Sequence, residues 1–209
     1  MYEKWKGVHT RCAFNMIQEL IPLTRPRTLA AALGPTILGA AFSYYAFGAA
    51  QGTGLAILHT VLIFLAVVTA QIVANLWNEY KDFKSGLDAG QKVGNAGSIT
   101  RGVITPELII TMIKVLMFVP IIIGLYLSAT ITWYYIPVGF LCILISFLYS
   151  GGPKPISRTP FGEISSGIAM GFTIVLITGY AWIRELSLAL LIPAIPSTLL
   201  VGSIMLTNN

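Results

Sequence analysis

Long apolar runs separated by polar connections dominate the chain. The longest stretch without Asp, Glu, Lys or Arg covers 51 residues, 28–78. Six apolar segments can be drawn, and each is near the roughly 20 residues that a helix needs to cross a bilayer core. The segments are 28–50, 54–77, 108–129, 132–150, 164–183 and 186–207. The pattern predicts an all-α, multi-pass transmembrane helical bundle.

The first 26 residues form a different kind of segment. They are charged and lack an early apolar core, so they do not resemble a cleaved signal. Four apolar residues between positions 14 and 21 fall at helical spacing, which predicts a short amphipathic helix at the membrane surface. Pro22 and Pro26 break this helix. We therefore expect an N-terminal segment, 1–26, followed by one transmembrane domain, 27–209.

Composition and charge support a membrane protein and give it an orientation. Hydrophobic residues make up 56% of the chain and charged residues 10%, whereas soluble domains carry about 25% charged residues. Alternating the six segments across a membrane puts 11 Lys and Arg residues on the side of the N-terminus and only Arg184 on the other side. Positive loops mark the cytoplasm. The sequence thus predicts a cell-membrane protein with cytoplasmic polar connections, and its basic excess reflects topology, not nucleic-acid binding.

A polar cluster stands where the second apolar segment ends. If the helix continues past position 77, then Asn75, Asn78, Glu79 and Asp82 lie at i, i+3, i+4 and i+7, on one helical face. Oxygen ligands gathered in this way suit Mg²⁺, which proteins hold with one or two carboxylates plus substrate phosphates. The alternative is that the cluster only ends a helix at the membrane surface, with its carboxylates in water.

Two connections could contribute to an anion site beside this cluster. The connection after the second segment is rich in glycine, and its Lys92 and Arg101 could offset the charge of a diphosphate. The connection after the fourth segment contains Gly151-Gly152-Pro153, which forbids a helix. Tyr149 stands at its edge, either to face a cation or as an ordinary interfacial aromatic residue.

Three stretches carry a resemblance to a known family. They are "RPRTLAAALGPTILGAAF", "NLWNEYKDFKSGLD" and "GGPKPISRTPFGE". The chain from about Arg25 onward resembles the UbiA-type intramembrane prenyltransferases. Within that family it is most similar to the branch that acts on 1,4-dihydroxy-2-naphthoate in menaquinone biosynthesis, since the hydroxybenzoate branch typically has Asp at the position of Gly86.

The resemblance implies a fold and a reaction. Members of the family form a nine-helix bundle around a central cavity, ionise an allylic polyprenyl diphosphate with Mg²⁺ and pass the prenyl group to an aromatic acceptor. Carried over by motif, Asn78 and Asp82 would be the Mg²⁺–diphosphate residues and Asp88 a third candidate, with Asn75 and Glu79 beside them. The acceptor would be 1,4-dihydroxy-2-naphthoate. Arg25 could also contact the diphosphate or only anchor the topology.

The end of the chain departs from the family pattern. The family has a second Asp-rich motif after its sixth helix, which in the naphthoate branch begins with two Asn residues. This chain finishes at Asn208 and Asn209. We therefore expect about six of the nine helices, a missing second motif, and little or no activity from this chain alone.

A non-catalytic membrane transporter or cation-binding protein is the alternative function. It predicts ionisable groups near the middle of the membrane, where only His59 and Lys114 are available. His59 is expected to be a packing residue, and Lys114 can reach the membrane surface with its long side chain. A membrane phosphotransferase would need a denser Asp-Gly…Asp pattern, which the chain lacks.

Overall fold

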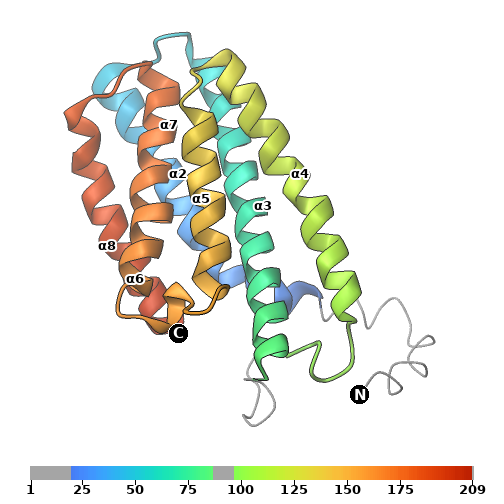
Figure 1. The fold of residues 1–209 in the computed structure, drawn as a ribbon. Coiled ribbons are helices and arrows are strands. Elements are labelled where there is room, and N and C mark those ends of the chain that lie inside the picture. Colours follow the sequence, from blue (N-terminus) through green and yellow to red (C-terminus); the bar gives the residue numbers. More distant parts are fainter. Residues whose placement is uncertain (1–19, 87–96, 209) are drawn as a thin grey trace.

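The computed structural model describes residues 20–86 and 97–208, and these residues form helices and their connections (Figure 1). Most of the predicted surface helix at the N-terminus, Asp88 and Lys92 lie outside the described residues. Its last part is described and is helical over 20–23, so the prediction that Pro22 breaks this helix is wrong. The helices are α2 (Pro26–Phe47), α3 (Thr53–Ser85), α4 (Pro106–Thr130), α5 (Tyr135–Ser150), η3 (Ile156–Arg158), α6 (Gly162–Ser166), η4 (Gly167–Phe172), α7 (Thr173–Ile183), η5 (Leu188–Leu190) and α8 (Leu191–Asn208).

The predicted all-α bundle is confirmed. Among the described residues, five helices or continuous helical runs are long and apolar enough to cross a membrane, and the shorter α5 is also apolar. Figure 1 shows α3 and α4 running side by side, and α5 packs against both of them. In the described part of the bundle, successive long helices run in alternating directions, and the connections between them lie at its two ends. We call the end where α3 finishes and α4 begins the polar end.

The outer surface of the bundle is apolar along the helices. On α4, Val115, Phe118 and Ile122 are each about three-fifths exposed. Soluble monomeric proteins rarely expose continuous apolar patches larger than a few hundred Å². An apolar surface that follows whole helices is therefore not expected to face water. It is the surface expected of helices in contact with lipid acyl chains, so the structure is that of a multi-pass membrane protein.

Helix α3 is longer than its apolar run. It continues for eight residues past position 77 and ends at Ser85, where Gly86 adopts φ 74° and closes the helix in the left-handed conformation that glycine tolerates best. Residues 75–82 are therefore helical throughout. The sequence predicted one face for the polar cluster only if the helix continued past position 77, and this continuation is confirmed.

The last turns of α3 are tied to α5. The indole Nε1 of Trp77 donates a hydrogen bond of 3.0 Å to the carbonyl of Phe147, and the two rings meet edge to face with centroids 5.1 Å apart. A buried indole N–H usually finds such a partner. The contact fixes α5 beside the polar residues of α3.

The run from α6 to α7 contains a π-helical stretch that packs tightly on α8. Single π turns inside helices often occur at functional sites. On the face of η4 toward α8, a Cβ atom added to Gly171 would lie only 2.6 Å from Cα of Thr198, and one on Gly167 would lie 2.7 Å from the Thr198 carbonyl oxygen. Small residues four positions apart let membrane helices approach closely in this way.

Replacing Gly171 with Ala is expected to loosen the contact between η4 and α8. Overpacking of a tight contact costs about 1–3 kcal/mol, so the detergent-solubilised protein should unfold several degrees lower in a thermal melt. Gly124→Ala is the matched control, because Gly124 is also helical and has open space where its Cβ would stand. An equal melting temperature for the two variants would contradict the tight packing.

Candidate functional site

A cavity opens at the polar end between α3, α5, the α6–η4 run and α8. Its water-accessible volume is about 60 Å³. One part of its wall is polar and another part is apolar, so it can receive a ligand that has both kinds of surface. The polar wall contains Arg25, Gln71, Asn75, Asn78, Ser146, Tyr149, Ser150 and Ser166, and the apolar wall contains Ala74, Ile145, Ala169, Met170 and Met205.

Asn78 is the centre of the polar wall. With its side-chain amide oriented so that both ends are satisfied, its oxygen accepts from the Arg25 guanidinium at 3.2 and 3.3 Å. Its nitrogen donates to Oδ2 of Asp82 at 3.0 Å and to Oγ of Ser150 at 3.2 Å. The amide thus joins a cation just before α2, a carboxylate on α3 and a hydroxyl on α5.

Asn75 holds the segment that carries Arg25. Its side-chain nitrogen donates to the Thr24 carbonyl at 2.8 Å and to Oγ1 of Thr28 at 3.3 Å. Arg25, between these two residues, has φ 48° and ψ 67°, a left-handed conformation that is uncommon for a residue other than glycine. Strained backbone of this kind often occurs at functional sites. The hydrogen bonds of Asn75 therefore help to fix the direction of the Arg25 side chain.

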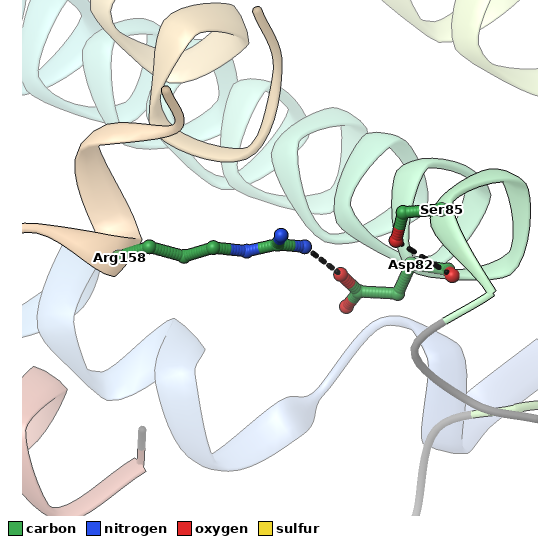
Figure 2. Close-up of polar contacts among 3 residues, drawn as sticks. All are labelled: Asp82, Ser85 and Arg158. Carbon is green, nitrogen blue, oxygen red and sulfur yellow. Dashed lines mark hydrogen bonds and ion pairs between the residues drawn. The ribbon is translucent and has the colours of Figure 1, made fainter. Parts of the chain in front are cut away.

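Asp82 also faces a cation on the other side. Nη2 of Arg158, from η3, lies 3.9 Å from Oδ1 of Asp82 (Figure 2). The Oγ of Ser85 donates to the Asp82 backbone carbonyl at 3.1 Å, which leaves the Asp82 carboxylate to its other partners. The Arg158 side chain is 49% exposed and that of Asp82 is 29% exposed, so water screens the pair and it is weak.

Glu79 points to a different part of the molecule. It is 1% exposed, and its carboxylate accepts hydrogen bonds from the backbone nitrogen of Gly97 at 2.8 and 3.0 Å and from that of Ile99 at 3.4 Å. It does not line the cavity. Glu79 therefore binds the connection between α3 and α4, whose Ile99 and Ile104 are buried against the helices.

The predicted residues thus divide into groups. The cavity brings together Arg25, Asn75, Asn78 and Tyr149, and Asp82 contacts this group through Asn78. Arg101 lies on the α3–α4 connection, where its guanidinium donates to Oγ of Ser98 at 3.2 Å. From its sequence position Arg158 was expected only to mark the cytoplasmic side, and its place in the Gly- and Pro-rich connection is the one sequence feature that hints at its contact with Asp82.

The donor set was tested for its fit to a metal ion. Within the described ranges, no group of three or more His, Cys, Asp and Glu side chains could hold one. Asp82 supplies a carboxylate, which is a ligand for a hard cation, whereas the Asn78 amide presents its nitrogen to Asp82 and its oxygen to Arg25, so this oxygen reaches a metal beside Asp82 only if the amide turns over. Mg²⁺ commonly takes its remaining ligands from water and substrate phosphates. The residues therefore fit a metal that arrives together with a diphosphate.

Replacing Glu79 with Gln is expected to release the α3–α4 connection. Gln presents an N–H₂ group to backbone N–H donors, and an unsatisfied buried group costs about 1–3 kcal/mol. Amide hydrogen exchange over residues 97–104 should become about tenfold faster or more. Glu185→Gln, at an exposed carboxylate at the other end of the bundle, should leave this exchange unchanged. Equal exchange in both variants would show that Glu79 does not anchor the connection.

Comparison with known proteins places these features in a family context. Residues 32–209 match the UbiA prenyltransferase family. The chain is 37% identical over 199 residues to the 1,4-dihydroxy-2-naphthoate octaprenyltransferase of Bacillus subtilis, covering 93% of this chain and 61% of the relative. It is 30% identical over 186 residues to the protein of the same name from Mycobacterium tuberculosis, covering 88% and 61%. The chain thus spans about three fifths of the length of these curated relatives.

Proposed function

Because the chain belongs to the UbiA prenyltransferase family, we propose that it transfers a polyprenyl group from an allylic polyprenyl diphosphate to 1,4-dihydroxy-2-naphthoate. The names of its relatives support this acceptor and a place in menaquinone biosynthesis. The observation that carries the proposal is the joined set of Arg25, Asn78 and Asp82 beside a cavity whose wall also includes Ala74, Ile145, Ala169, Met170 and Met205. A polar group that binds an anion next to an apolar space fits a lipid with a diphosphate head.

The polar wall binds and orients the diphosphate. Arg25 can donate two parallel hydrogen bonds to phosphate oxygens, as guanidinium groups do. Asn78 and Asp82 would hold the metal. Members of the family generally depend on a divalent ion, and the oxygen-only donor set favours Mg²⁺. The metal, when bound, neutralises the charge that develops on the leaving diphosphate.

The reaction breaks the bond between the allylic carbon and the bridging oxygen, and the electron pair leaves with the diphosphate. The allylic carbon then forms a bond with the carboxyl-bearing carbon of the naphthoate ring. The carboxylate on that carbon then leaves as CO₂, and the electron pair of the broken C–C bond restores the aromaticity of the ring. The Tyr149 ring at the cavity edge can lie against the allylic cation.

The charge distribution supports an orientation in the membrane. The polar end carries the basic connections, which include Lys154 and Arg158, and basic connections face the cytoplasm. The diphosphate site then opens to the cytoplasm, and the prenyl tail lies among apolar helices in contact with membrane lipids. A transporter is less well supported, because His59 and Lys114 do not line the cavity.

A product assay tests the proposal. The complete protein in lipid nanodiscs is incubated with octaprenyl diphosphate, 1,4-dihydroxy-2-naphthoate and MgCl₂, and the products are analysed by mass spectrometry. We expect a decarboxylated prenyl naphthalenediol, which disappears when EDTA replaces MgCl₂. The absence of this product from well-folded protein with Mg²⁺ would overturn the proposed function.

A further inference from the structure

The cavity contains a second polar group, deeper than Asn78, that the proposed diphosphate site does not use. Gln71 on α3 is 8% exposed and lines the cavity. Its side-chain amide has no hydrogen-bond partner within the part of the chain that the structure describes. The side chain of Ser146 on α5, which lines the same cavity, is also without one there. The two other side-chain amides in the wall, those of Asn75 and Asn78, are both paired.

Among the described residues the Gln71 side chain is unpaired, but its amide atoms reach the cavity, since they are not among the fully buried polar atoms without a partner. Burying an amide without a hydrogen bond costs about 1–3 kcal/mol by protein mutational data, and the large majority of buried polar side-chain atoms have a partner. An amide that faces a cavity can obtain this partner from water or from a ligand. Gln71 stands in the middle of an apolar run, where a polar side chain would be unfavourable if it served only to pack the helices together.

The distance of Gln71 from the diphosphate-binding residues suits a group that contacts the aromatic acceptor. It lies seven residues before Asn78, which is about 10 Å along a helix. Ser146 lies four residues before Ser150, or about 6 Å. Helices α3 and α5 both run toward the polar end (Figure 1). Gln71 and Ser146 therefore stand on the far side of the diphosphate-binding residues, where a ring attacking the allylic carbon would lie.

We propose that Gln71 and Ser146 form the subsite that recognises the oxygen substituents of the aromatic acceptor. This inference rests on the proposed function. A Gln amide both donates and accepts hydrogen bonds, so it can pair with a ring hydroxyl and a carboxylate or carbonyl of the same acceptor. As a neutral group, it does this without the cost of a charge at membrane depth.

The opposite wall allows a ring to enter. A volume of about 60 Å³ holds only a few water molecules. Met170 and Met205 form part of the apolar wall, and methionine side chains change rotamer easily to fit different shapes. Their movement would widen the cavity beside Gln71 while Asn75 and Asn78 keep their hydrogen bonds.

The test is a comparison of acceptor and donor binding in the complete protein. Gln71→Met keeps the length of the side chain but removes its donor and acceptor. With 1-hydroxy-2-naphthoate as the acceptor probe, its dissociation constant should rise tenfold or more, and that of a non-hydrolysable prenyl diphosphate analogue should stay within about twofold. Ser146→Ala should weaken acceptor binding about threefold. Leu65→Met, on an exposed position of α3, is the matched control and should change neither constant.

Each outcome has a distinct meaning. Unchanged acceptor binding in Gln71→Met would overturn the subsite and leave water as the partner of the amide. A wild-type protein that does not bind the acceptor probe would also overturn the subsite. Retained donor binding shows that the variant is folded. If Gln71→Met fails to fold, Gln71→Asn takes its place, since the shortened amide should lose the acceptor in the same way. Selective loss of acceptor binding without prenylated product from the wild type would uphold the subsite and reject the proposed function.

Discussion

Replacing Asp82 with Asn is expected to lower kcat/KM for prenyl transfer by a hundred- to a thousandfold. The variant keeps the size of the side chain and its ability to accept from Asn78, whose amide nitrogen lies 3.0 Å away. It loses the negative charge that would hold a divalent metal beside the diphosphate. Removing one group that stabilises charge in a transition state typically costs about 10²–10³ in rate.

The metal titration makes this prediction specific. If Asp82 is a metal ligand, the Mg²⁺ concentration that gives half-maximal activity should rise about tenfold or more in Asp82→Asn, because a neutral amide binds a hard cation more weakly. Glu107→Gln is the control, since it removes an exposed carboxylate from the same end of the bundle. It should leave both the rate and the Mg²⁺ dependence unchanged. If Asp82→Asn keeps more than a third of the wild-type rate, Asp82 has no essential role in the reaction.

The pairing of Asp82 with Arg158 does not conflict with a role in metal binding. The two side chains are 3.9 Å apart and partly in water, and exposed ion pairs contribute only about 0–1 kcal/mol. An incoming metal–diphosphate complex can displace such a contact at little cost.

Much of the architecture followed from the apolar pattern. Among the described residues, five of the six expected spans are confirmed as helices or helical runs long enough to cross a membrane, and the segment 132–150 is the shorter apolar helix α5. A helix in lipid must satisfy its own backbone groups, so its apolar run has a characteristic length. The extension of α3 to Ser85 was expected only conditionally. The π-helical stretch η4 was not expected, because its cause is the close packing of Gly167 and Gly171 on α8, which no local pattern reveals.

The polar cluster shows where a helical pattern stops being informative. Successive residues of an α-helix are turned by about 100°, so Asn78 and Glu79 lie at opposite edges of the predicted stripe. Asn78 faces the cavity, whereas Glu79 reaches Gly97, eighteen residues later. The metal-binding role of Glu79 remains a prediction, and in this structure its carboxylate binds the backbone of the α3–α4 connection. The partner of Glu79 depends on how the connection folds back, which the sequence pattern does not contain.

Replacing Arg25 is expected to separate its backbone strain from its chemistry. Two variants, Arg25→Gly and Arg25→Ala, both remove the guanidinium that contacts Asn78. Charge-assisted hydrogen bonds contribute about 1.5–3 kcal/mol, which corresponds to roughly a ten- to hundredfold loss of affinity. Both variants should therefore bind the prenyl diphosphate ten- to a hundredfold more weakly. Lys114→Gln, which removes an exposed cation from α4, should not change donor binding.

Stability should distinguish the two variants from each other. At φ 48°, a Cβ atom costs roughly 1–2 kcal/mol that glycine does not incur, so Arg25→Gly should melt a few degrees above Arg25→Ala although both lack the same side chain. Equal melting temperatures would mean that the left-handed turn before α2 relaxes once the guanidinium is gone. In that case the hydrogen bonds of Asn75 to Thr24 and Thr28 would not be sufficient to hold the turn, and Arg25 itself would maintain the conformation that directs it to Asn78.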